Sequence, residues 1–272
     1  MKTIGEILKL SGDFLVSKKI ERGKRVAEEI LAHVLQLKRM DLYLQYDRPM
    51  VDAEIAHMRE KVRRLALGEP VEYVIGSVDF FGCQIGVDPR VLIPRPETEL
   101  LVEKVAKIAK RGVLWDLCTG SGCIGIALKK ANPELQVTLS DISQEALQVA
   151  SENAKRNGAE LALAHGDLLA PFQGKRADFI VANPPYVAAH EYVKGFEPEK
   201  AFLAGASGIE VYVRLQKEMK KYLQPGGSVF FEIGSNQKEK LLSLFPGASI
   251  ECDYANHPRY LFFNADLLPS LG

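Results

Sequence analysis

The chain has 272 residues, a length that suits one large domain and a smaller one. Lys plus Arg and Asp plus Glu each number 35, so the formal net charge is zero, which argues against a broad, non-specific surface for nucleic acid. The four cysteines form no C-x-x-C pair and no zinc-ligand spacing, so we expect reduced thiols and no bound metal.

The first residues include acidic side chains, Glu6 and Asp13, where a signal peptide requires an uninterrupted apolar core. No apolar run approaches the length of a membrane span. We therefore expect a cytoplasmic protein that has no membrane segment.

Residues 1–69 are expected to form a small helical domain. Apolar residues fall on one helical face in each of two segments, 26–35 and 55–65. The stretch DRPMVD (47–52) separates these helices, and LGEP (67–70) ends the second one. A bundle of this size suits an adaptor that docks a protein partner.

Residues 70–96 are predicted to form a connector. The stretch VEYVIGSVDFFGCQIGVD is rich in Val, Ile and aromatic residues punctuated by glycine, which favours a β-hairpin. A helix is expected to begin near the prolines of PRPETE (94–99) or at Thr98. In the same stretch, Arg95 and Glu97 are interpreted as an ion pair that pins the connector, with contact to a substrate as the alternative.

Strands and helices alternate in residues 97–272. The short apolar runs GVLWDLC, LQVTLSD, LALAHGD, ADFIVAN and GSVFFEIG occur together with segments of helical character at 122–131, 143–157, 207–223 and 236–244. This alternation predicts βαβ units and a mostly parallel, doubly wound α/β sheet of Rossmann-like type. Such sheets bind their ligands at the carboxyl ends of the strands.

The first strand of this region ends in a glycine-rich turn. Asp116 lies at the end of the strand, and the turn is neither G-x-G-x-x-G nor a Walker loop with its lysine. An acid here suits the ammonium group of an amino-acid-bearing nucleoside such as S-adenosylmethionine (SAM) better than a pyrophosphate. The alternative is a tight strand-to-helix turn that binds no ligand. The turn residues that we assign to cofactor binding are Cys118, Thr119, Gly120, Ser121 and Gly122.

The next two strands also end in acidic residues. Asp141 and the adjacent Ile142 are assigned to cofactor binding. Asp141 lies about twenty residues after the turn, where its carboxylate suits both ribose hydroxyls. Asp167 and Leu168 in GDLL are assigned to an adenine pocket, through a hydrogen bond to the exocyclic amine and through packing. Taken alone, Asp167 would more often be a helix N-cap.

The fourth strand ends in N-P-P-Y, residues 183–186. Asn183 offers a side-chain oxygen as acceptor, and Pro185 holds Pro184 extended so that its carbonyl is rigid. Tyr186 supplies a flat apolar wall. We interpret the four residues as a receptor for a planar –NH2 group that is methylated in place, with Asn183, Pro184 and Tyr186 as the catalytic set and Pro185 as a further substrate contact. A proline-bounded surface turn is the alternative.

Together these stretches resemble the SAM-dependent, release-factor-specific glutamine N5-methyltransferase family over nearly the whole chain. The resemblance rests on PVEYVIGSVDFFG, VLIPRPETELLVE, DLCTGSGCIGIAL, SDIS, GDLL, NPPY and LQPGGSVFFEIGSNQ. N-P-P-Y alone is shared with adenine-N6 methyltransferases, whereas IPRPETE is more particular to this family.

The resemblance implies a class I SAM-dependent methyltransferase fold. It also implies methylation of the glutamine in the Gly-Gly-Gln loop of class I peptide chain release factors, with S-adenosylhomocysteine as the second product. The family's cofactor site falls on 118–122, Asp141, Leu168 and Asn183, and its substrate site falls on 183–186. The N-terminal helices would dock the release factor. We expect a monomer without sequence-specific binding to nucleic acid.

Three positions depart from the family pattern. Cys118 stands where the family usually has glycine, Ser207 follows Gly205-Ala206 in place of the usual Gly-Gly and Asp, and the usual glycine before Arg259 is absent. If position 118 needs a positive φ, its cysteine is strained.

Other functions remain open from the sequence. A sister enzyme acting on a glutamine of a large-subunit ribosomal protein would use the same chemistry. An adenine-N6 methyltransferase and a SAM sensor without activity are further alternatives. His165 and His190 lie near strand ends, but amide methylation needs no base, so we interpret both as packing or surface residues.

Overall fold

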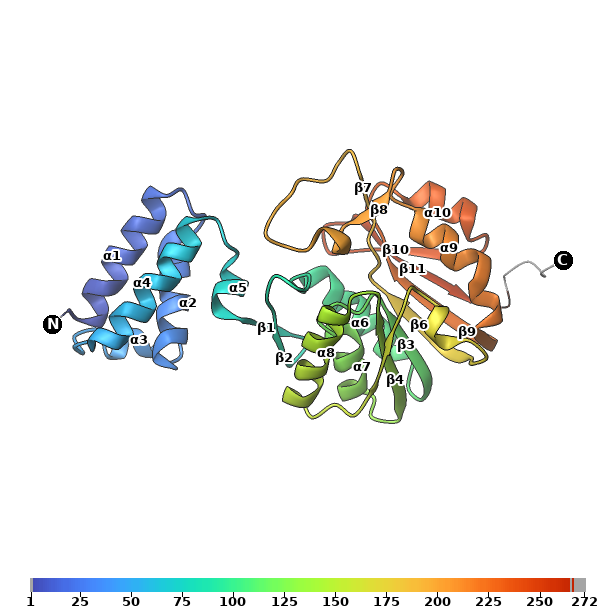
Figure 1. Cartoon of the computed structure of the whole chain (residues 1–272), viewed down its shortest axis with the longest axis horizontal. Helices are drawn as coiled ribbons and strands as arrows, with labels where there is room; N and C mark the ends of the chain where they lie inside the picture. Colours follow the sequence, from blue (N-terminus) through green and yellow to red (C-terminus); the bar gives the residue numbers. More distant parts are fainter. Residues whose placement is uncertain (1, 265, 267–272) are drawn as a thin grey trace. The chain divides into compact units, whose positions relative to one another are not determined.

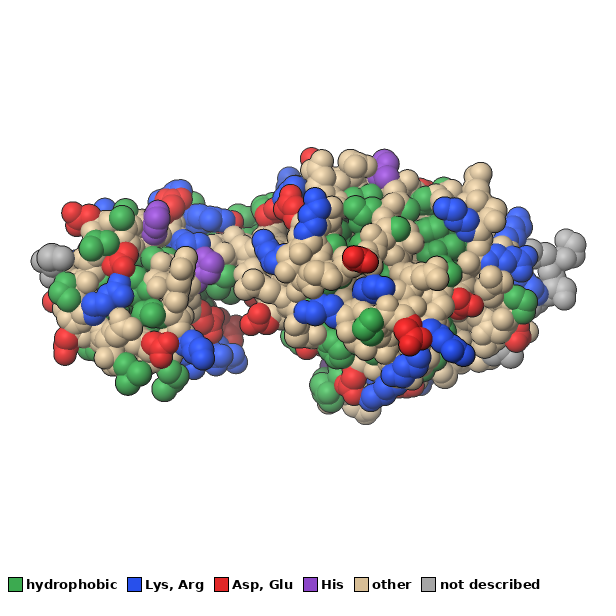
Figure 2. All heavy atoms as spheres, turned by 90° about the horizontal axis from the view of Figure 1, so that it is seen from below, with side chains coloured by type: hydrophobic (Ala, Val, Ile, Leu, Met, Phe, Trp, Pro, Cys, Tyr) green, Lys and Arg blue, Asp and Glu red, His purple; other side chains and the backbone are tan. Residues whose placement is uncertain are grey.

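The computed structural model describes residues 2–264 and 266 (Figure 1). The chain divides into two compact units, Met1–Ser77 and Val78–Gly272. Among the described residues, no helix combines the length and the apolar character that crossing a membrane requires. Figure 2 shows basic and acidic side chains interspersed on the visible face of each unit, as the balanced composition predicts.

The first unit is helical. A capping box begins its first helix, since Thr3 and Glu6 each bond the other's backbone N–H. Gly23 permits close packing of the first two helices, because a Cβ there would lie 3.0 Å from the carbonyl carbon of Leu15. The buried core includes Ile30, Leu31 and Met58. The helices are α1 (Ile4–Ser17), α2 (Gly23–Leu35), α3 (Asp41–Leu44), α4 (Asp52–Ala66) and α5 (Val71–Ile75).

A two-stranded sheet, β1 (Ser77–Phe80) and β2 (Cys83–Gly86), precedes the main sheet of the second unit. The main sheet has the order β10-β11-β9-β6-β3-β4-β5. The five strands from β9 to β5 are parallel, while β11 and β10 are antiparallel at one edge. The strands are β3 (Gly112–Leu117), β4 (Leu135–Asp141), β5 (Ala162–His165), β6 (Ala177–Ala182), β9 (Leu223–Glu232), β10 (Ser249–Cys252) and β11 (Pro258–Asn264).

Helices form two layers against this sheet (Figure 1). One layer consists of α6 (Pro96–Ile108), α7 (Cys123–Ala131) and α8 (Gln144–Arg156). The other consists of α9 (Glu210–Glu218) and α10 (Lys238–Leu244). Short segments complete the unit: the parallel pair β7 (Val187–Ala188) and β8 (Leu203–Gly205), and the 3₁₀ turns η1 (Ala170–Phe172), η2 (Glu199–Ala201) and η3 (Met219–Lys221).

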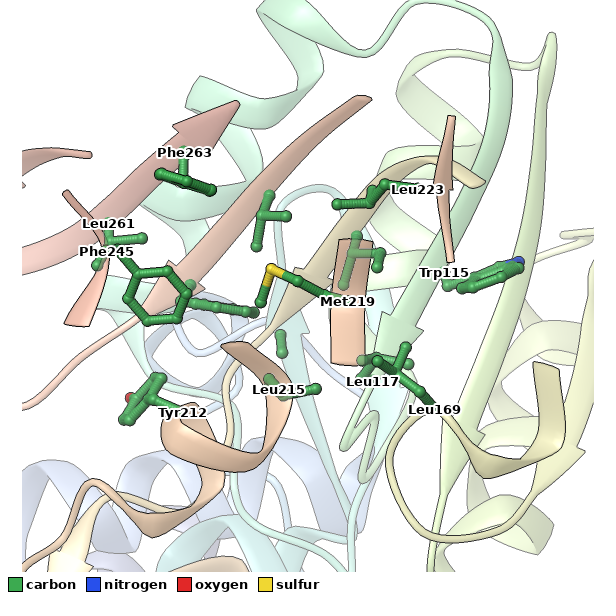
Figure 3. Packing of buried hydrophobic residues seen from close by; sticks show 14 of the residues in the cluster. Trp115, Leu117, Leu169, Tyr212, Leu215, Met219, Leu223, Phe245, Leu261 and Phe263 are labelled. Atoms are coloured by element: carbon green, nitrogen blue, oxygen red, sulfur yellow. The ribbon is translucent and has the colours of Figure 1, made fainter. Parts of the chain in front are cut away.

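One large apolar cluster lies between the sheet and the layer of α9 and α10 (Figure 3). Trp115 stacks on Phe172 with ring centroids 3.9 Å apart. Because side chains alternate along a strand, Trp115 lies on the face opposite its neighbour Asp116, which contacts α7. This mostly parallel α/β sheet and the helical N-terminal region confirm the fold class predicted from the sequence.

Candidate active site

The carboxyl ends of the parallel strands form a common edge. Leu117 of β3 pairs with Ser140 of β4 and with Ala182 of β6, and Asp141 pairs with His165 of β5. The glycine turn, Asp141, GDLL and the N-P-P-Y turn therefore all leave the sheet at this edge. This is the edge at which doubly wound sheets bind their ligands.

The Asp116 side chain holds the glycine turn in place through hydrogen bonds. Its side chain is fully buried, and Oδ2 accepts hydrogen bonds from Thr119 Oγ1 at 2.6 Å and from the backbone N–H of Gly125 at 3.0 Å. Oδ1 is buried without a hydrogen-bond partner among the described residues. Burial raises the pKa of Asp116 to about 7. A positively charged group or a hydrogen-bond donor of a ligand would stabilise the ionised form of this buried carboxylate.

Three turn residues have positive φ. Gly120 and Gly122 adopt 53° and 83°, which glycine does without steric cost. Cys118 adopts 56°, so a side chain stands where the backbone favours glycine. Burial, together with the neighbouring carboxylate of Asp141, raises the pKa of the Cys118 thiol, which is therefore protonated at neutral pH.

Asp141 links two backbone segments at the edge. Its Oδ2 accepts from the N–H of Gly120 and its Oδ1 accepts from the N–H of Ser143, both at 2.9 Å. Each oxygen retains a lone pair, so the carboxylate can still receive hydroxyl donors. Burial raises the pKa of Asp141. The adjacent Ile142 is 58% exposed and offers an apolar surface beside the carboxylate.

The segment that follows β5 presents Asp167 and Leu168. Asp167 forms an ion pair with Arg214 of α9 at 2.5 Å, and Arg214 is a partner that the sequence analysis did not identify. Leu168 has φ +48° and packs against the apolar cluster. His165 and His190 are both exposed, and His165 Nε2 lies 3.0 Å from the carbonyl oxygen of Ile142.

The N-P-P-Y turn is anchored from the loop between β9 and α10. The buried Gln237 donates through Nε2 to the carbonyl oxygens of Tyr186 at 2.9 Å and of Gly208 at 3.0 Å. A Cβ on Gly208, which has φ +82°, would lie 2.7 Å from the Tyr186 carbonyl oxygen, so only glycine fits there. The turn is therefore fixed by tertiary contacts as well as by its two prolines.

A buried carboxylate lies behind the turn. Glu232, at the end of β9, is 2% exposed. Its Oε2 accepts from Thr98 Oγ1 at 2.7 Å, and its Oε1 lies 3.5 Å from the Tyr186 hydroxyl. The same Thr98 oxygen lies 3.4 Å from Nδ2 of Asn183. Burial raises the pKa of Glu232 to about 7, against the opposing effects of the Thr98 hydrogen bond and the Arg259 charge.

Glu232 and Gln237 were not identified as site residues from the sequence. An acid that ends the buried strand GSVFFEIG is the signal that could have pointed to Glu232, because charged residues are rarely buried without a partner.

The predicted pair of Arg95 and Glu97 is replaced by a different ion pair. Arg95 Nη2 contacts Glu197 Oε2 at 2.6 Å, and Glu197 Oε1 accepts from the N–H of Ile93 at 2.9 Å. Glu97 lies in the first turn of α6, where its backbone carbonyl accepts from the Tyr260 hydroxyl. The partner of Arg95 is distant in sequence, so local spacing suggested the wrong acid.

A small cavity of about 50 Å³ opens beside the turn. Asn183, Tyr186 and Glu232 contribute to its wall together with Arg95. The remaining wall is mostly apolar and consists of Leu92, Val187, Ala201 and Phe202. The cavity therefore offers a few polar groups in an apolar surround, as small-molecule sites commonly do.

Known proteins match this chain along most of its length. Residues 96–245 match the methyltransferase small domain, and residues 6–76 match the PrmC N-terminal domain. The release factor glutamine methyltransferase of Geobacter sulfurreducens is 35% identical over 264 residues, covering 94% of this chain and 93% of that protein. This chain belongs to the release factor glutamine methyltransferase family. The Chlamydia trachomatis serovar D member is 36% identical, covering 94% and 92%.

A solved structure supports the fold. The Thermus thermophilus 16S rRNA N2 G1207 methyltransferase, determined with AdoMet and guanosine, aligns with a TM-score of 0.54 at 19% identity. The alignment covers 69% of this chain and 49% of that one. The family resemblance and the class I methyltransferase fold predicted from the sequence are confirmed.

Proposed function

We propose that this protein transfers a methyl group from SAM to the side-chain amide nitrogen, N5, of the glutamine in the Gly-Gly-Gln loop of class I peptide chain release factors. Its membership of the release factor glutamine methyltransferase family supports this activity. The observation that carries the proposal at the site is Asn183, held at the end of β6 beside the glycine turn.

The residues at the strand ends fit SAM. The unpaired, buried Oδ1 of Asp116 suits a positively charged amino-acid moiety, and Asp141 retains acceptor capacity for the ribose hydroxyls. Ile142 and Leu168 offer apolar surface for adenine, with Asp167 as acceptor for its amine. When bound, SAM supplies an electrophilic methyl group on a positively charged sulfur. The turn residues proposed to surround it are Cys118, Thr119, Gly120, Ser121 and Gly122.

The N-P-P-Y turn is proposed to hold the glutamine amide. Asn183 Oδ1 and the Pro184 carbonyl accept one N–H each, while Pro185, which lacks an N–H, leaves that carbonyl free of local competition. Tyr186 packs against the amide plane. Fixed acceptors keep electron density on the nitrogen and aim its lone pair at one point.

No protein base is required. The amide nitrogen gains a carbon and becomes strongly acidic, so water accepts the proton that it loses. The exposed positions of His165 and His190 agree with this interpretation.

The helical unit is proposed to dock the release factor. Large apolar side chains are exposed on α1, at Leu10, Phe14 and Val16. Others are exposed on and around α3, and Leu44 is 83% exposed. Exposed large apolar side chains favour a protein partner over nucleic acid. The members around α3 are Met40, Tyr43, Leu44 and Tyr46.

The experiment that tests this function is a transfer assay with radiolabelled SAM. The substrates are a purified class I release factor, the same factor with its Gly-Gly-Gln glutamine replaced by alanine, large-subunit ribosomal proteins, and DNA or RNA. We expect label on the unmodified release factor and none on its alanine variant. Label on ribosomal protein or nucleic acid alone would overturn the proposal.

A further inference from the structure

We propose that Thr98 and Glu232 are positioning residues that determine which way the Asn183 side-chain amide faces, so that its oxygen is presented to the substrate. The inference rests on the proposed function, in which Asn183 Oδ1 accepts a hydrogen bond from the glutamine –NH2 group. It concerns residues of α6 and β9 that lie behind the N-P-P-Y turn.

The direction of the Asn183 amide decides whether the site accepts an amine. An asparagine side chain carries an acceptor oxygen and a donor –NH2 group of nearly the same shape. With its oxygen toward the substrate, Asn183 accepts from an –NH2 group. After a half-turn about the Cβ–Cγ bond, the –NH2 group of Asn183 faces the –NH2 group of the substrate, and the two donor groups repel each other. An asparagine with no other partner would adopt both orientations.

The hydrogen bonds of Thr98 leave only one orientation of the Asn183 amide satisfied. An ionised Glu232 carries no hydrogen, so Thr98 Oγ1 must be the donor in the 2.7 Å bond between them. A hydroxyl has one hydrogen, so the Thr98 oxygen can then act toward Asn183 only as an acceptor. It lies 3.4 Å from Asn183 Nδ2, which is a donor. Asn183 Oδ1 is thereby left for the substrate.

Of the two contacts that Thr98 makes, the buried one with Glu232 is the stronger. Thr98 and Glu232 are each 2% exposed, so water has little access to either group. The bond between them is 2.7 Å long and charge-assisted, whereas the contact of Thr98 with Asn183, at 3.4 Å, is longer than a usual N–H···O hydrogen bond and therefore weaker. The carboxylate of Glu232 therefore fixes the direction of the Thr98 hydroxyl, and this direction makes Thr98 an acceptor toward Asn183. The other oxygen of Glu232 faces the Tyr186 hydroxyl at 3.5 Å, so one carboxylate orients two residues of the turn.

The arrangement also accounts for PRPETE at the start of α6. Pro96 is at the first position of that helix, and Thr98 lies in its first turn. Arg95, immediately before the helix, is held by Glu197. The proline and the ion pair thus fix the backbone that carries the Thr98 hydroxyl.

Protonation of Glu232 would remove this constraint on the direction of the Thr98 hydroxyl. A protonated carboxyl can donate to Thr98, whose own hydrogen is then free to turn toward Asn183 Oδ1. Burial raises the pKa of Glu232 to about 7, so the change falls in the neutral range. Transfer is expected to fall as the pH drops through this value. The titratable and charged groups that act on Glu232 are Arg259, Glu97, Tyr186, Tyr212, Tyr260 and Cys123.

The test compares Thr98→Val, which keeps the shape of the side chain but lacks the hydroxyl, with Thr98→Ser, which keeps the hydroxyl. Thr138→Val, on β4 and away from the turn, is the matched control. Methyl transfer to the release factor and SAM binding by calorimetry are measured for each. We expect Thr98→Val to lower kcat roughly tenfold or more, with SAM affinity unchanged. Thr98→Ser and Thr138→Val should resemble the parent.

A second arm uses the pH profile. In the parent, kcat should rise with pH in the neutral range, giving an ascending limb in the pH profile. This limb should be absent from Glu232→Gln, because glutamine does not titrate. Glu160→Gln, an exposed acid elsewhere, should keep the limb. Parental kcat in Thr98→Val, or an unchanged limb in Glu232→Gln, would overturn the inference. These outcomes are distinct from failure of the proposed function: if the parent labels the release factor, the function stands whatever the Thr98 and Glu232 variants do, whereas a parent that leaves the release factor unlabelled overturns the function itself.

Discussion

Arg95 and Glu197 form a 2.6 Å ion pair although they are 102 residues apart in the sequence. Glu197 also accepts a hydrogen bond from the N–H of Ile93, so one carboxylate binds both the charge and the backbone of the segment that precedes α6. The loop between β7 and η2 is thereby attached beside the cavity that Asn183 and Tyr186 line.

The first prediction concerns this attachment. Glu197→Gln keeps an acceptor for Ile93 but removes the charge that Arg95 contacts. Because the Arg95 side chain is 41% exposed, stability should change by less than about 1 kcal/mol. The KM for the release factor should rise several-fold as the loop loosens, while SAM affinity stays constant. Glu199→Gln, an exposed acid in η2, serves as the control, and equal KM values in the two variants would contradict the account.

The second prediction concerns the strained turn. Cys118→Gly should stabilise the protein by about 1 kcal/mol, because glycine adopts φ +56° without steric cost. Cys252→Gly, in β10, should instead destabilise it by about 0.5–1 kcal/mol, because glycine weakens a strand. Urea unfolding measures both. A shift in the same direction for the two variants would show that the cysteine at 118 carries no strain.

The third prediction concerns the acid that joins the turn to α8. Asp141→Asn replaces one acceptor oxygen by –NH2, which then faces the N–H of either Gly120 or Ser143. SAM affinity should fall by about 1.5–3 kcal/mol in a calorimetric titration. Asp178→Asn makes the same substitution at a carboxylate that accepts from the N–H of Val113, at the opposite end of β3. It should leave SAM affinity unchanged, and equal losses in the two variants would argue against the assignment of Asp141.

The fourth prediction is a pH dependence of stability. The pKa of Glu232 is raised from 4.5 to about 7 in the folded protein. The stability that this group contributes is therefore fully present below about pH 4.5 and is lost as the pH rises through about 7. Glu232→Gln should remove this slope and stabilise the protein at pH 8 by as much as ~3 kcal/mol. Thermal melts between pH 5 and pH 8 measure it, and parallel curves for parent and variant would refute the shift.

Much of the fold follows from local patterns. Apolar periodicity predicted α2 and α4 of the first unit, and the runs that end at Leu117, Asp141 and Ala182 became adjacent parallel strands. The start of the expected hairpin connector is instead the helix α5, because Val, Tyr and Ile favour a strand by propensity but also occur in a short helical turn. The turn at 118–122 could be recognised because its glycines are conformationally necessary. The antiparallel strands β10 and β11 at the sheet edge were not predicted. β10 has only four residues, most of them exposed, and so lacks an apolar run, whereas β11 contains the apolar run YLFF but follows no helical segment of the alternating pattern.

The residues behind the site depend on contacts that the sequence does not reveal. Thr98 and Glu232 are 134 residues apart, and neither has an unusual neighbour that would suggest a shared hydrogen bond. Gln237 supports Tyr186 across 51 residues. The assignments of Asn183 and Asp141 to ligands remain predictions that variants at these two positions test, and the assignment of Asp167 to adenine also remains a prediction.

The most direct test of the central claim is Asn183→Ala, assayed in parallel for SAM binding and for methyl transfer to a class I release factor. Because Asn183 Oδ1 is assigned to the substrate amide, SAM should bind with parental affinity while transfer falls below detection. Parental transfer, or loss of SAM binding together with transfer, would contradict that assignment.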